Sequence, residues 1–235
     1  MVLSKNMQKL VAGSSTIRKL FEEGIELAKE VGAENVYDFS LGNPAAPVPE
    51  KVKKSIYDIL ENRNANFVHC YMPNAGYPEV REKVAANLNK KYDSSFTKED
   101  IIMTVGAAGG INCVLRCLLE QEDEVLCFAP FFGEYNSYVM NFGGNLKVVP
   151  ADYETFQLNV EEADKYITER TKAVIINNPN NPSGVVYNKE TLIRLQKMLE
   201  KAEERIGHPI YVLSDEPYRE LAYDGVEVPY LTKYY

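Results

Sequence analysis

The chain has 235 residues, of which 45% are hydrophobic and 26% charged, so it can bury the core of one large domain or two small ones. Its formal net charge is -8 and it has no run of lysine or arginine, which argues against nucleic acid as a partner. The N-terminus shows no secretion signal and no apolar run is long enough to span a bilayer, so we expect a cytoplasmic protein without membrane contact.

The first hundred residues are predicted to be mainly helical. Apolar residues at helical spacing predict a helix over residues 17–31, ended by Gly32. A short extended piece is expected over residues 36–41. Pro49 and Pro78 each begin a further predicted helix, because proline is favoured in the first helical turn.

From residue 101 onward, short apolar runs alternate with helical stretches. The predicted strands cover residues 101–105, 125–129, 146–149, 173–176 and 210–213. The predicted helices between them cover residues 111–119, 134–142 and 189–205, and the small residues 106–110 precede the first of these helices. This alternation predicts an α/β protein, a three-layer α/β/α sandwich with a mostly parallel sheet covered by helices on both faces.

The four cysteines are interpreted as buried thiols in a reducing compartment. Cys113 and Cys117 lie four residues apart in a predicted helix and therefore share one face. A metal pair there is conceivable, but the chain has two histidines and no CxxC motif. We expect no metal site.

Ligands of open α/β sheets bind at the carboxyl ends of the strands, so the residues after each predicted strand are the candidates for a site. Small residues at 106–110 could present backbone N–H groups to an anion, or they could form only a tight turn. Phe132 could cover the face of a flat ligand, although a lone aromatic residue more often packs in a core. Residues 106–110 lack the glycine and lysine motifs of nucleotide-binding loops, which disfavours a nucleotide as the ligand.

Two further strand ends carry polar groups. The segment 177–184 contains two Asn-Pro steps and ends in Gly184, so it predicts a rigid loop that presents Asn181. Asp215 follows a buried strand and needs either a ligand partner or a helix to cap. Tyr218 lies one helical turn further and could reach the same pocket, or it could be a surface tyrosine. Together these strand ends describe a pocket for a flat, phosphorylated, nitrogen-containing ring.

This set of segments resembles the class I/II aminotransferases of the aspartate aminotransferase type, which are fold-type I enzymes dependent on pyridoxal 5'-phosphate (PLP). Asn178-Pro179-Asn180-Asn181-Pro182-Ser183-Gly184 matches the family's NPxNP[TS]G motif, and Asp215-Glu216-Pro217-Tyr218 matches its D-E-x-Y segment. Residues 104–109 resemble its phosphate-binding turn. Weaker resemblances are the Y-x-x-x-x-G-x-x-x-x-R stretch from Tyr71 to Arg81 and the GxP of Gly42-Asn43-Pro44.

The resemblance implies a role for each candidate residue. Asp215 would pair with the pyridine N–H⁺ of PLP, while Asn181 and Tyr218 would donate to the ring's phenolic oxygen. By the same resemblance, backbone groups of Gly106, Ala107 and Ala108 would bind the phosphate of PLP, and Phe132 would stack on the face of its ring. Tyr71 would reach the phosphate bound in a neighbouring subunit, and Gly42 would lie beside the substrate carboxylate. The implied reaction transfers an amino group between an amino acid and a 2-oxo acid, in a homodimer.

The family's catalytic lysine has no match in this sequence. Lys233 is the one lysine after Tyr218, and its neighbours do not fit the family motif, so we interpret it as a solvated loop lysine. No catalytic residue is assigned within the chain, and the lysine is expected beyond Tyr235. By resemblance, residues 1–48 form an N-terminal arm and small-domain segment. Residues 49–235 would form a PLP-binding large domain that is incomplete at the C-terminus, without the C-terminal small domain.

Two expectations follow from that interpretation. The chain by itself should not transaminate, and strands missing from the sheet should leave apolar strand edges exposed. Three alternatives remain open, because the motifs hold the cofactor without choosing its reaction. They are a PLP-dependent C–S lyase, a decarboxylase, and a catalytically inert PLP-binding domain.

Overall fold

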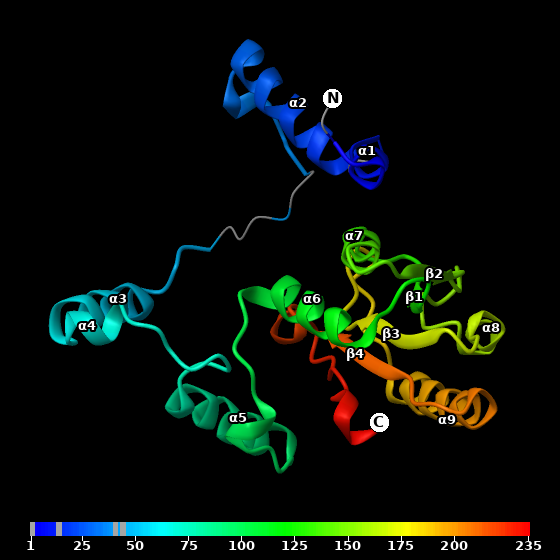
Figure 1. Ribbon diagram of the computed structural model, residues 1–235. Coiled ribbons are helices and arrows are strands. Elements are labelled where there is room, and N and C mark those ends of the chain that lie inside the picture. Colours follow the sequence, from blue (N-terminus) through cyan, green and yellow to red (C-terminus); the bar gives the residue numbers. More distant parts are fainter. Residues whose placement is uncertain (1–2, 13–15, 40–41, 43–45) are drawn as a thin grey trace. The chain divides into compact units, whose positions relative to one another are not determined.

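The computed structural model describes residues 3–12, 16–39, 42 and 46–235, and it divides the chain into two compact units. The first unit is Met1–Met72 and the second is Pro73–Tyr235. Figure 1 labels the helices and strands of both units. The predicted boundary at residue 48 remains a prediction.

The first unit is helical. Its elements are α1 (Lys5–Ala12), α2 (Thr16–Val31), the 3-10 turn η1 (Ala33–Asn35), α3 (Glu50–Asn62) and α4 (Ala65–Val68). The helix predicted over residues 17–31 is confirmed as α2, and Gly32 follows it with a φ of 90°, a conformation that glycine adopts without steric cost. Pro49 precedes α3 as predicted. Asn43 and Pro44 lie outside the described residues.

The second unit contains a four-stranded parallel sheet. Its strands are β1 (Glu124–Phe128), β2 (Asn145–Val149), β3 (Thr171–Asn177) and β4 (Tyr211–Asp215). Their order across the sheet is β2-β1-β3-β4, and every neighbouring pair is parallel. The predicted α/β class and parallel sheet are therefore confirmed.

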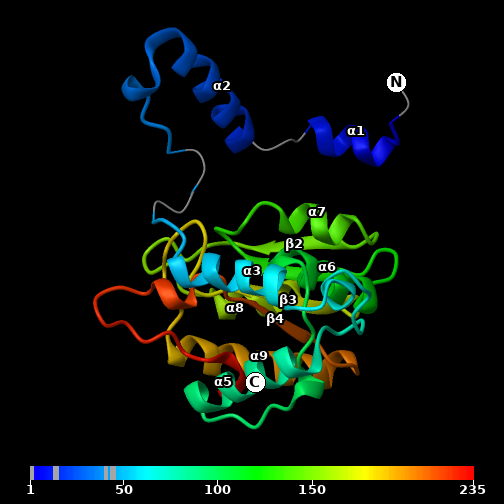
Figure 2. The same cartoon turned by 90° about the vertical axis from the view of Figure 1, so that its left-hand side faces the viewer.

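Helices cover both faces of this sheet, as Figures 1 and 2 show. The helices of the second unit are α5 (Pro78–Tyr92), α6 (Gly106–Leu118), α7 (Tyr135–Met140), α8 (Val160–Ala163) and α9 (Lys189–Ile206), and the last four of these pack on the sheet. The short 3-10 turns are η2 (Lys98–Asp100), η3 (Asp164–Tyr166), η4 (Arg219–Leu221) and η5 (Leu231–Lys233). Alternate strand residues point to opposite faces, so the sheet supports two separate cores. α6 and α7 pack on Val125, Ala173 and Ile175, whereas α8 and α9 pack on Leu126, Val174 and Ile176.

The prediction of a strand at residues 101–105 is wrong. These residues have no regular secondary structure, and Val105 is 95% exposed. A strand requires a neighbour for its backbone groups, and none of the described strands pairs with this segment. The segment is instead held near α5, where the Arg81 guanidinium donates to the carbonyl of Ile101 at 2.7 Å and the N–H of Met103 donates to the carbonyl of Ala75 at 3.0 Å.

The prediction of four buried thiols is also wrong. Cys127 is buried in β1, and burial raises the pKa of its thiol to about 12, whereas Cys70, Cys113 and Cys117 are exposed. Cys113 and Cys117 do share a face of α6. That face lies opposite the one carrying Ile111 and Leu115, which packs on the sheet.

No described helix has both the length and the apolar character needed to cross a membrane. Within the described residues, no three cysteine, histidine or acidic side chains gather as metal ligands would.

Candidate functional site

The carboxyl ends of β1, β3 and β4 meet at one edge of the sheet. The chain leaves β1 toward β2 on one side, while β3 lies on the other side of β1, so the strand order reverses between β1 and β3. Ligands of open parallel sheets bind at such a reversal, because the loops diverge there and leave a crevice. The segments that follow the three strands begin at Ala129, Asn178 and Glu216.

A cavity of about 220 Å³ lies at this edge. It is lined by residues from four segments, namely Ala107, Ala108, Ile111, Phe132, Tyr138, Asn177, Asn181, Asp215, Pro217 and Tyr218. The structure therefore brings together six residues that the sequence singled out from separate strand ends. These are the two alanines, Phe132, Asn181, Asp215 and Tyr218.

Asp215 ends β4 and is the acidic residue of this lining. One carboxylate oxygen, Oδ2, accepts a hydrogen bond of 2.6 Å from the hydroxyl of Tyr135. The other oxygen, Oδ1, is buried and has no hydrogen-bond partner among the described residues. Burial raises the pKa of the Asp215 carboxyl, the bond from Tyr135 lowers it, and the nearby Glu216 raises it again. Asp215 does not cap a helix, so the alternative structural role does not apply.

The loop after β3 is held by its own asparagines. The side chain of Asn177 accepts from the N–H of Asn181 at 2.5 Å and donates to the carbonyl of Asp215 at 2.9 Å. Asn180 accepts from the N–H and the hydroxyl of Ser183. Gly184 has a φ of 73°, a positive value that glycine adopts without steric cost. These bonds fix Asn181 at the cavity, where its side-chain amide donates to the hydroxyl of Tyr218 at 3.2 Å.

The segment after β4 is anchored by Arg219. Its guanidinium forms an ion pair with Glu216 at 2.7 Å and donates to the carbonyls of Val228 and Pro229. The same group lies 5.4 Å and 5.2 Å from the ring centroids of Tyr92 and Tyr230, which stack on each other. We call these four side chains, Arg219, Glu216, Tyr92 and Tyr230, the Arg219 latch. Because Tyr218 precedes Arg219 directly, the latch restrains the position of Tyr218.

The first turn of α6 supplies backbone donors. Helix N-termini carry N–H groups without intrahelical partners, and none of the described residues accepts from those of Ala107 or Ala108. Gly106 has a φ of 71°, and its N–H already donates to the carbonyl of Thr104 at 3.0 Å. In this conformation the N–H groups without a partner among the described residues are therefore those of Ala107 and Ala108 rather than that of Gly106.

The other predicted residues lie elsewhere. Gly42 and Tyr71 are exposed residues of the first unit, and their roles remain predictions. Lys233 ends η5, is exposed and does not line the cavity, in agreement with its interpretation as a solvated lysine. No lysine is among the residues that line the cavity.

Sequence reasoning missed three polar residues of the site, Tyr135, Tyr138 and Asn177. The two tyrosines belong to α7, and with 16 tyrosines in the chain no pattern distinguished them. Asn177 is the last residue of β3 and is 4% exposed, although an asparagine among buried aliphatic residues requires partners for its amide. That requirement is the signal that could have identified it.

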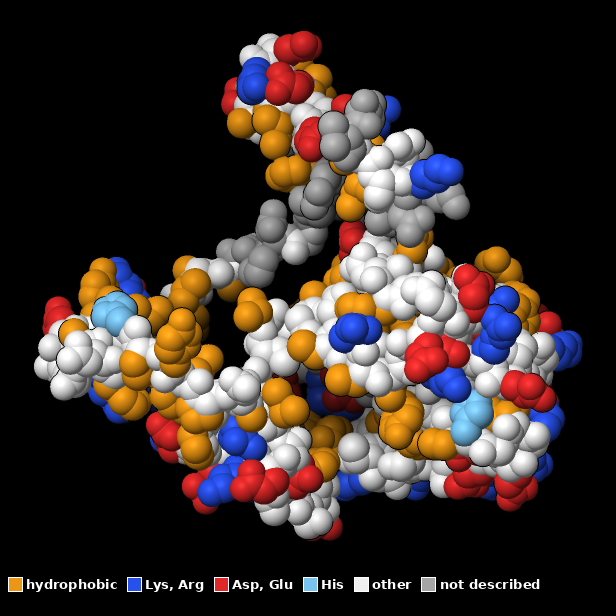
Figure 3. Space-filling view, in the orientation of Figure 1, with side chains coloured by type: hydrophobic (Ala, Val, Ile, Leu, Met, Phe, Trp, Pro, Cys, Tyr) orange, Lys and Arg blue, Asp and Glu red, His pale blue; other side chains and the backbone are white. Residues whose placement is uncertain are grey.

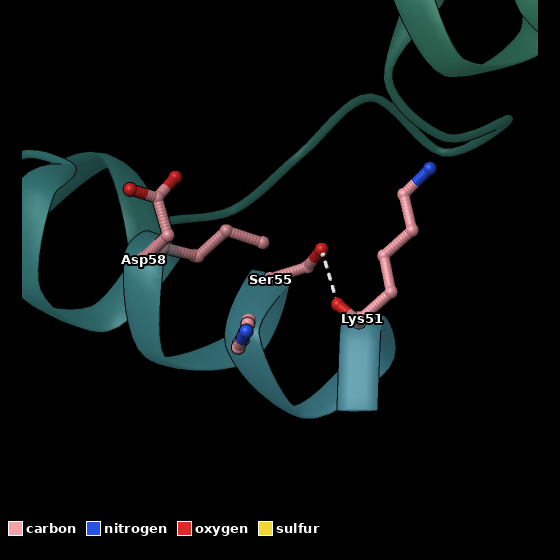
Figure 4. Close-up of a pocket in the computed structure, with 5 residues that line it drawn as sticks. Lys51, Ser55 and Asp58 are labelled. Carbon is pink, nitrogen blue, oxygen red and sulfur yellow. Dashed lines mark hydrogen bonds between the residues drawn. The ribbon is translucent and has the colours of Figure 1, made fainter. Parts of the chain in front are cut away.

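A larger hollow lies on the first unit, but it does not resemble a functional site. It measures about 490 Å³ and is lined by Lys51, Lys54, Ser55, Asp58 and Ile59, all from α3. Figure 4 shows its labelled side chains on successive turns, with the Ser55 hydroxyl donating to the carbonyl of Lys51 at 2.8 Å. Because all its residues come from one exposed helix and the hydroxyl serves that helix, no set of groups from different elements converges there.

The chain is similar over most of its length to curated aminotransferases. The chain is 35% identical to aromatic-amino-acid aminotransferase 2 of Thermococcus litoralis over 97% of this chain and 54% of that protein. It is 31% identical to the aspartate/prephenate aminotransferase of Thermus thermophilus, again over 54% of the relative. The chain thus spans about half the length of these curated relatives.

Solved structures agree. An aminotransferase from Eubacterium rectale superposes with a TM-score of 0.95 at 42% identity, covering 100% of this chain and 59% of that one. The aspartate aminotransferase of Thermotoga maritima gives a TM-score of 0.86 at 28% identity, covering 99% and 58%. The family model described as aminotransferase class I and II matches residues 33–233. The chain therefore belongs to the class I and II aminotransferases.

Proposed function

We propose that the cavity at the carboxyl edge of the sheet binds pyridoxal 5'-phosphate. The observation that carries the proposal is the buried Oδ1 of Asp215, which has no partner among the described residues while Oδ2 is bonded to Tyr135. An unpaired acceptor in a partly buried carboxylate is costly, so the site suits a ligand that brings a donor. A protonated ring nitrogen is such a donor.

The other groups fit the rest of that cofactor. Phe132 offers an aromatic face, and Asn181 and Tyr218 offer an amide and a phenol for a ring oxygen. The unbonded N–H groups of Ala107 and Ala108 lie at the positive end of α6, which favours a phosphate. When bound, the cofactor supplies the electron-withdrawing ring of its chemistry, and a negative Asp215 keeps that ring protonated.

We propose further that the family reaction, amino-group transfer between an amino acid and a 2-oxo acid, is the activity to which this site contributes. The membership in the family supports this choice over a lyase or decarboxylase reaction, since the residues of the cavity hold a cofactor without choosing its reaction. Within the described residues, no lysine amine lines the cavity to move a proton at the substrate. We therefore expect the 235-residue chain to bind the cofactor without turning over substrate.

The binding proposal can be tested with pyridoxamine 5'-phosphate, the aminated form of the cofactor, which needs no covalent bond to lysine. Titration followed by calorimetry should show saturable binding to the folded chain. Asp215→Ala should weaken that binding by about tenfold or more, because it removes a charge-assisted hydrogen bond. The control Asp224→Asn removes a negative charge from an exposed position after η4 and should leave the affinity unchanged.

Two results would contradict the binding proposal. One is no saturable binding at millimolar ligand by a chain that unfolds cooperatively, and the other is equal affinity in Asp215→Ala. Amino-group transfer to a 2-oxo acid above the rate of free cofactor would instead contradict the expectation that the chain lacks a proton-transfer group for turnover.

A further inference from the structure

Tyr135 is the buried residue on which two predicted cofactor contacts converge. It begins α7 and is 1% exposed, packed in the core that α6 and α7 form on the sheet. It does not line the cavity, and neither the motifs nor the family resemblance pointed to it. Its hydroxyl donates to Oδ2 of Asp215, which lies 80 residues later in the chain.

The same residue supports Phe132. The two rings meet edge to face with centroids 5.7 Å apart at 84°, and the N–H of Tyr135 donates to the carbonyl of Phe132 at 3.1 Å. Edge-to-face aromatic contacts favour one relative orientation of the rings. Tyr135 therefore contacts both Phe132, which is proposed to cover the face of the cofactor ring, and Asp215, which is proposed to bind the ring nitrogen.

The hydroxyl is suited to orienting a carboxylate without neutralising it. Burial raises the pKa of Tyr135, and the bond to Asp215 raises it further, so the phenol stays protonated and remains a donor. A neutral donor satisfies one oxygen of Asp215 and leaves the full negative charge in place. A lysine or arginine at this position would cancel that charge and weaken the attraction for a protonated ring nitrogen.

We propose that Tyr135 is a positioning residue that holds Oδ2 of Asp215 and so assigns Oδ1 to the ring nitrogen of the bound cofactor. The proposal rests on the proposed function, since it needs the cofactor in the cavity. The backbone of Asp215 is fixed independently by the Asn177 amide and the N–H of Asn178, both of which donate to its carbonyl. The phenol therefore controls the orientation of the carboxylate rather than the path of the chain.

The test uses Tyr135→Phe, which removes the hydroxyl and keeps the ring against Phe132. The probe is pyridoxamine 5'-phosphate labelled with ¹⁵N in its ring, followed by NMR and by titration. Without the phenol the Asp215 carboxyl becomes more basic and keeps the proton, so the ring ¹⁵N signal should move toward that of a neutral pyridine. The affinity should fall by about tenfold, the effect of one charge-assisted hydrogen bond.

The matched control is Tyr235→Phe. Its hydroxyl also donates at 2.6 Å, but to the carbonyl of Ile210, and it does not line the cavity. This variant should lose some stability while the ring ¹⁵N signal and the affinity stay as in the parent chain. An equal ¹⁵N signal in Tyr135→Phe and parent chain, with binding intact in both, would overturn the positioning role and leave the binding proposal standing. Failure of the parent chain to bind would instead overturn the binding proposal.

A second measurement covers the case in which Tyr135→Phe does not fold. In the unaltered chain, the hydroxyl proton of Tyr135 should give a slowly exchanging downfield signal because its bond to Asp215 is short and buried. Binding of pyridoxamine 5'-phosphate changes the charge sharing at Asp215, so this signal should shift during the titration. A hydroxyl signal that stays in place while the ligand saturates the site would refute the proposal.

Discussion

α3 of the first unit and α9 of the second unit are both amphipathic helices, yet their apolar faces have different surroundings. On α9, Leu192, Leu195 and Leu199 are each at most 1% exposed because they pack on the sheet. On α3, the apolar residues Val52, Ile56, Ile59 and Leu60 remain between 43% and 58% exposed, and the helix buries none of its residues. Figure 3 shows such hydrophobic side chains at the surface of α3 and α4. An apolar stripe thus specifies a helix and its inner face, but a neighbouring surface decides whether that face is buried.

Core truncation tests this comparison with the largest expected effect. Leu199→Ala should lower the free energy of unfolding by about 2–5 kcal/mol, because it leaves a cavity against the sheet. Ile56→Ala on α3 should change it by about 0.5 kcal/mol or less, since the side chain is already hydrated. Urea denaturation of both variants measures the difference, and similar losses would show that α3 buries its apolar face in solution.

Buried and exposed ion pairs can be compared in the same way as buried and exposed apolar side chains, with the Arg219 latch as the buried case. Arg219→Gln should lower the free energy of unfolding by about 2–3 kcal/mol, because it leaves two carbonyls without their donor and removes the cation paired with the mostly buried Glu216, which keeps only the bond from the Ser214 hydroxyl. The control Arg194→Gln breaks an exposed pair with Glu161 and should cost at most about 0.5 kcal/mol. A loss at Arg219 no greater than at Arg194 would argue against the latch.

Helix caps allow a smaller and more direct comparison of the two units. Asn188 caps α9 by accepting from the N–H of Thr191 at 2.8 Å, and Asn188→Ala should cost about 1 kcal/mol. Asn64 caps the four-residue α4 by accepting from the N–H of Asn66 at 2.8 Å. Asn64→Ala should cost less, because a short exposed helix frays without unfolding the unit. Equal losses by chemical denaturation would contradict the distinction.

The smallest expected effect concerns the partly buried carboxyl of Asp215. Its pKa is raised above 3.8, so the stability linked to this group is complete below pH 3.8 and is lost as the pH rises through the folded-state pKa. Asp215→Asn has no proton to release there. Its stability relative to the parent chain should therefore increase from acidic to neutral pH in the absence of cofactor. Urea midpoints at both pH values measure this, and a difference independent of pH would refute it.

Local patterns predicted the elements and the edge of the sheet where the site lies. The helices after Pro49 and Pro78 and the four paired strands were recognisable because apolar periodicity and proline or glycine ends reflect short-range sterics. Asp215 and Asn181 were identifiable because they follow apolar strands directly. The strand at residues 101–105 was mispredicted because its apolar composition satisfied the pattern, while a strand also needs a hydrogen-bonded neighbour.

The order of residues along the chain was enough to specify the parallel strands, the loop of 177–184 and the acid that ends β4. The tertiary structure alone decided that Tyr135 bonds Asp215, that Cys113 and Cys117 face outward, and that the Arg219 latch restrains Tyr218. The physical reason is separation along the chain. Tyr135 and Asp215 are 80 residues apart, and only the pairing and layering of the strands bring such groups within hydrogen-bonding distance.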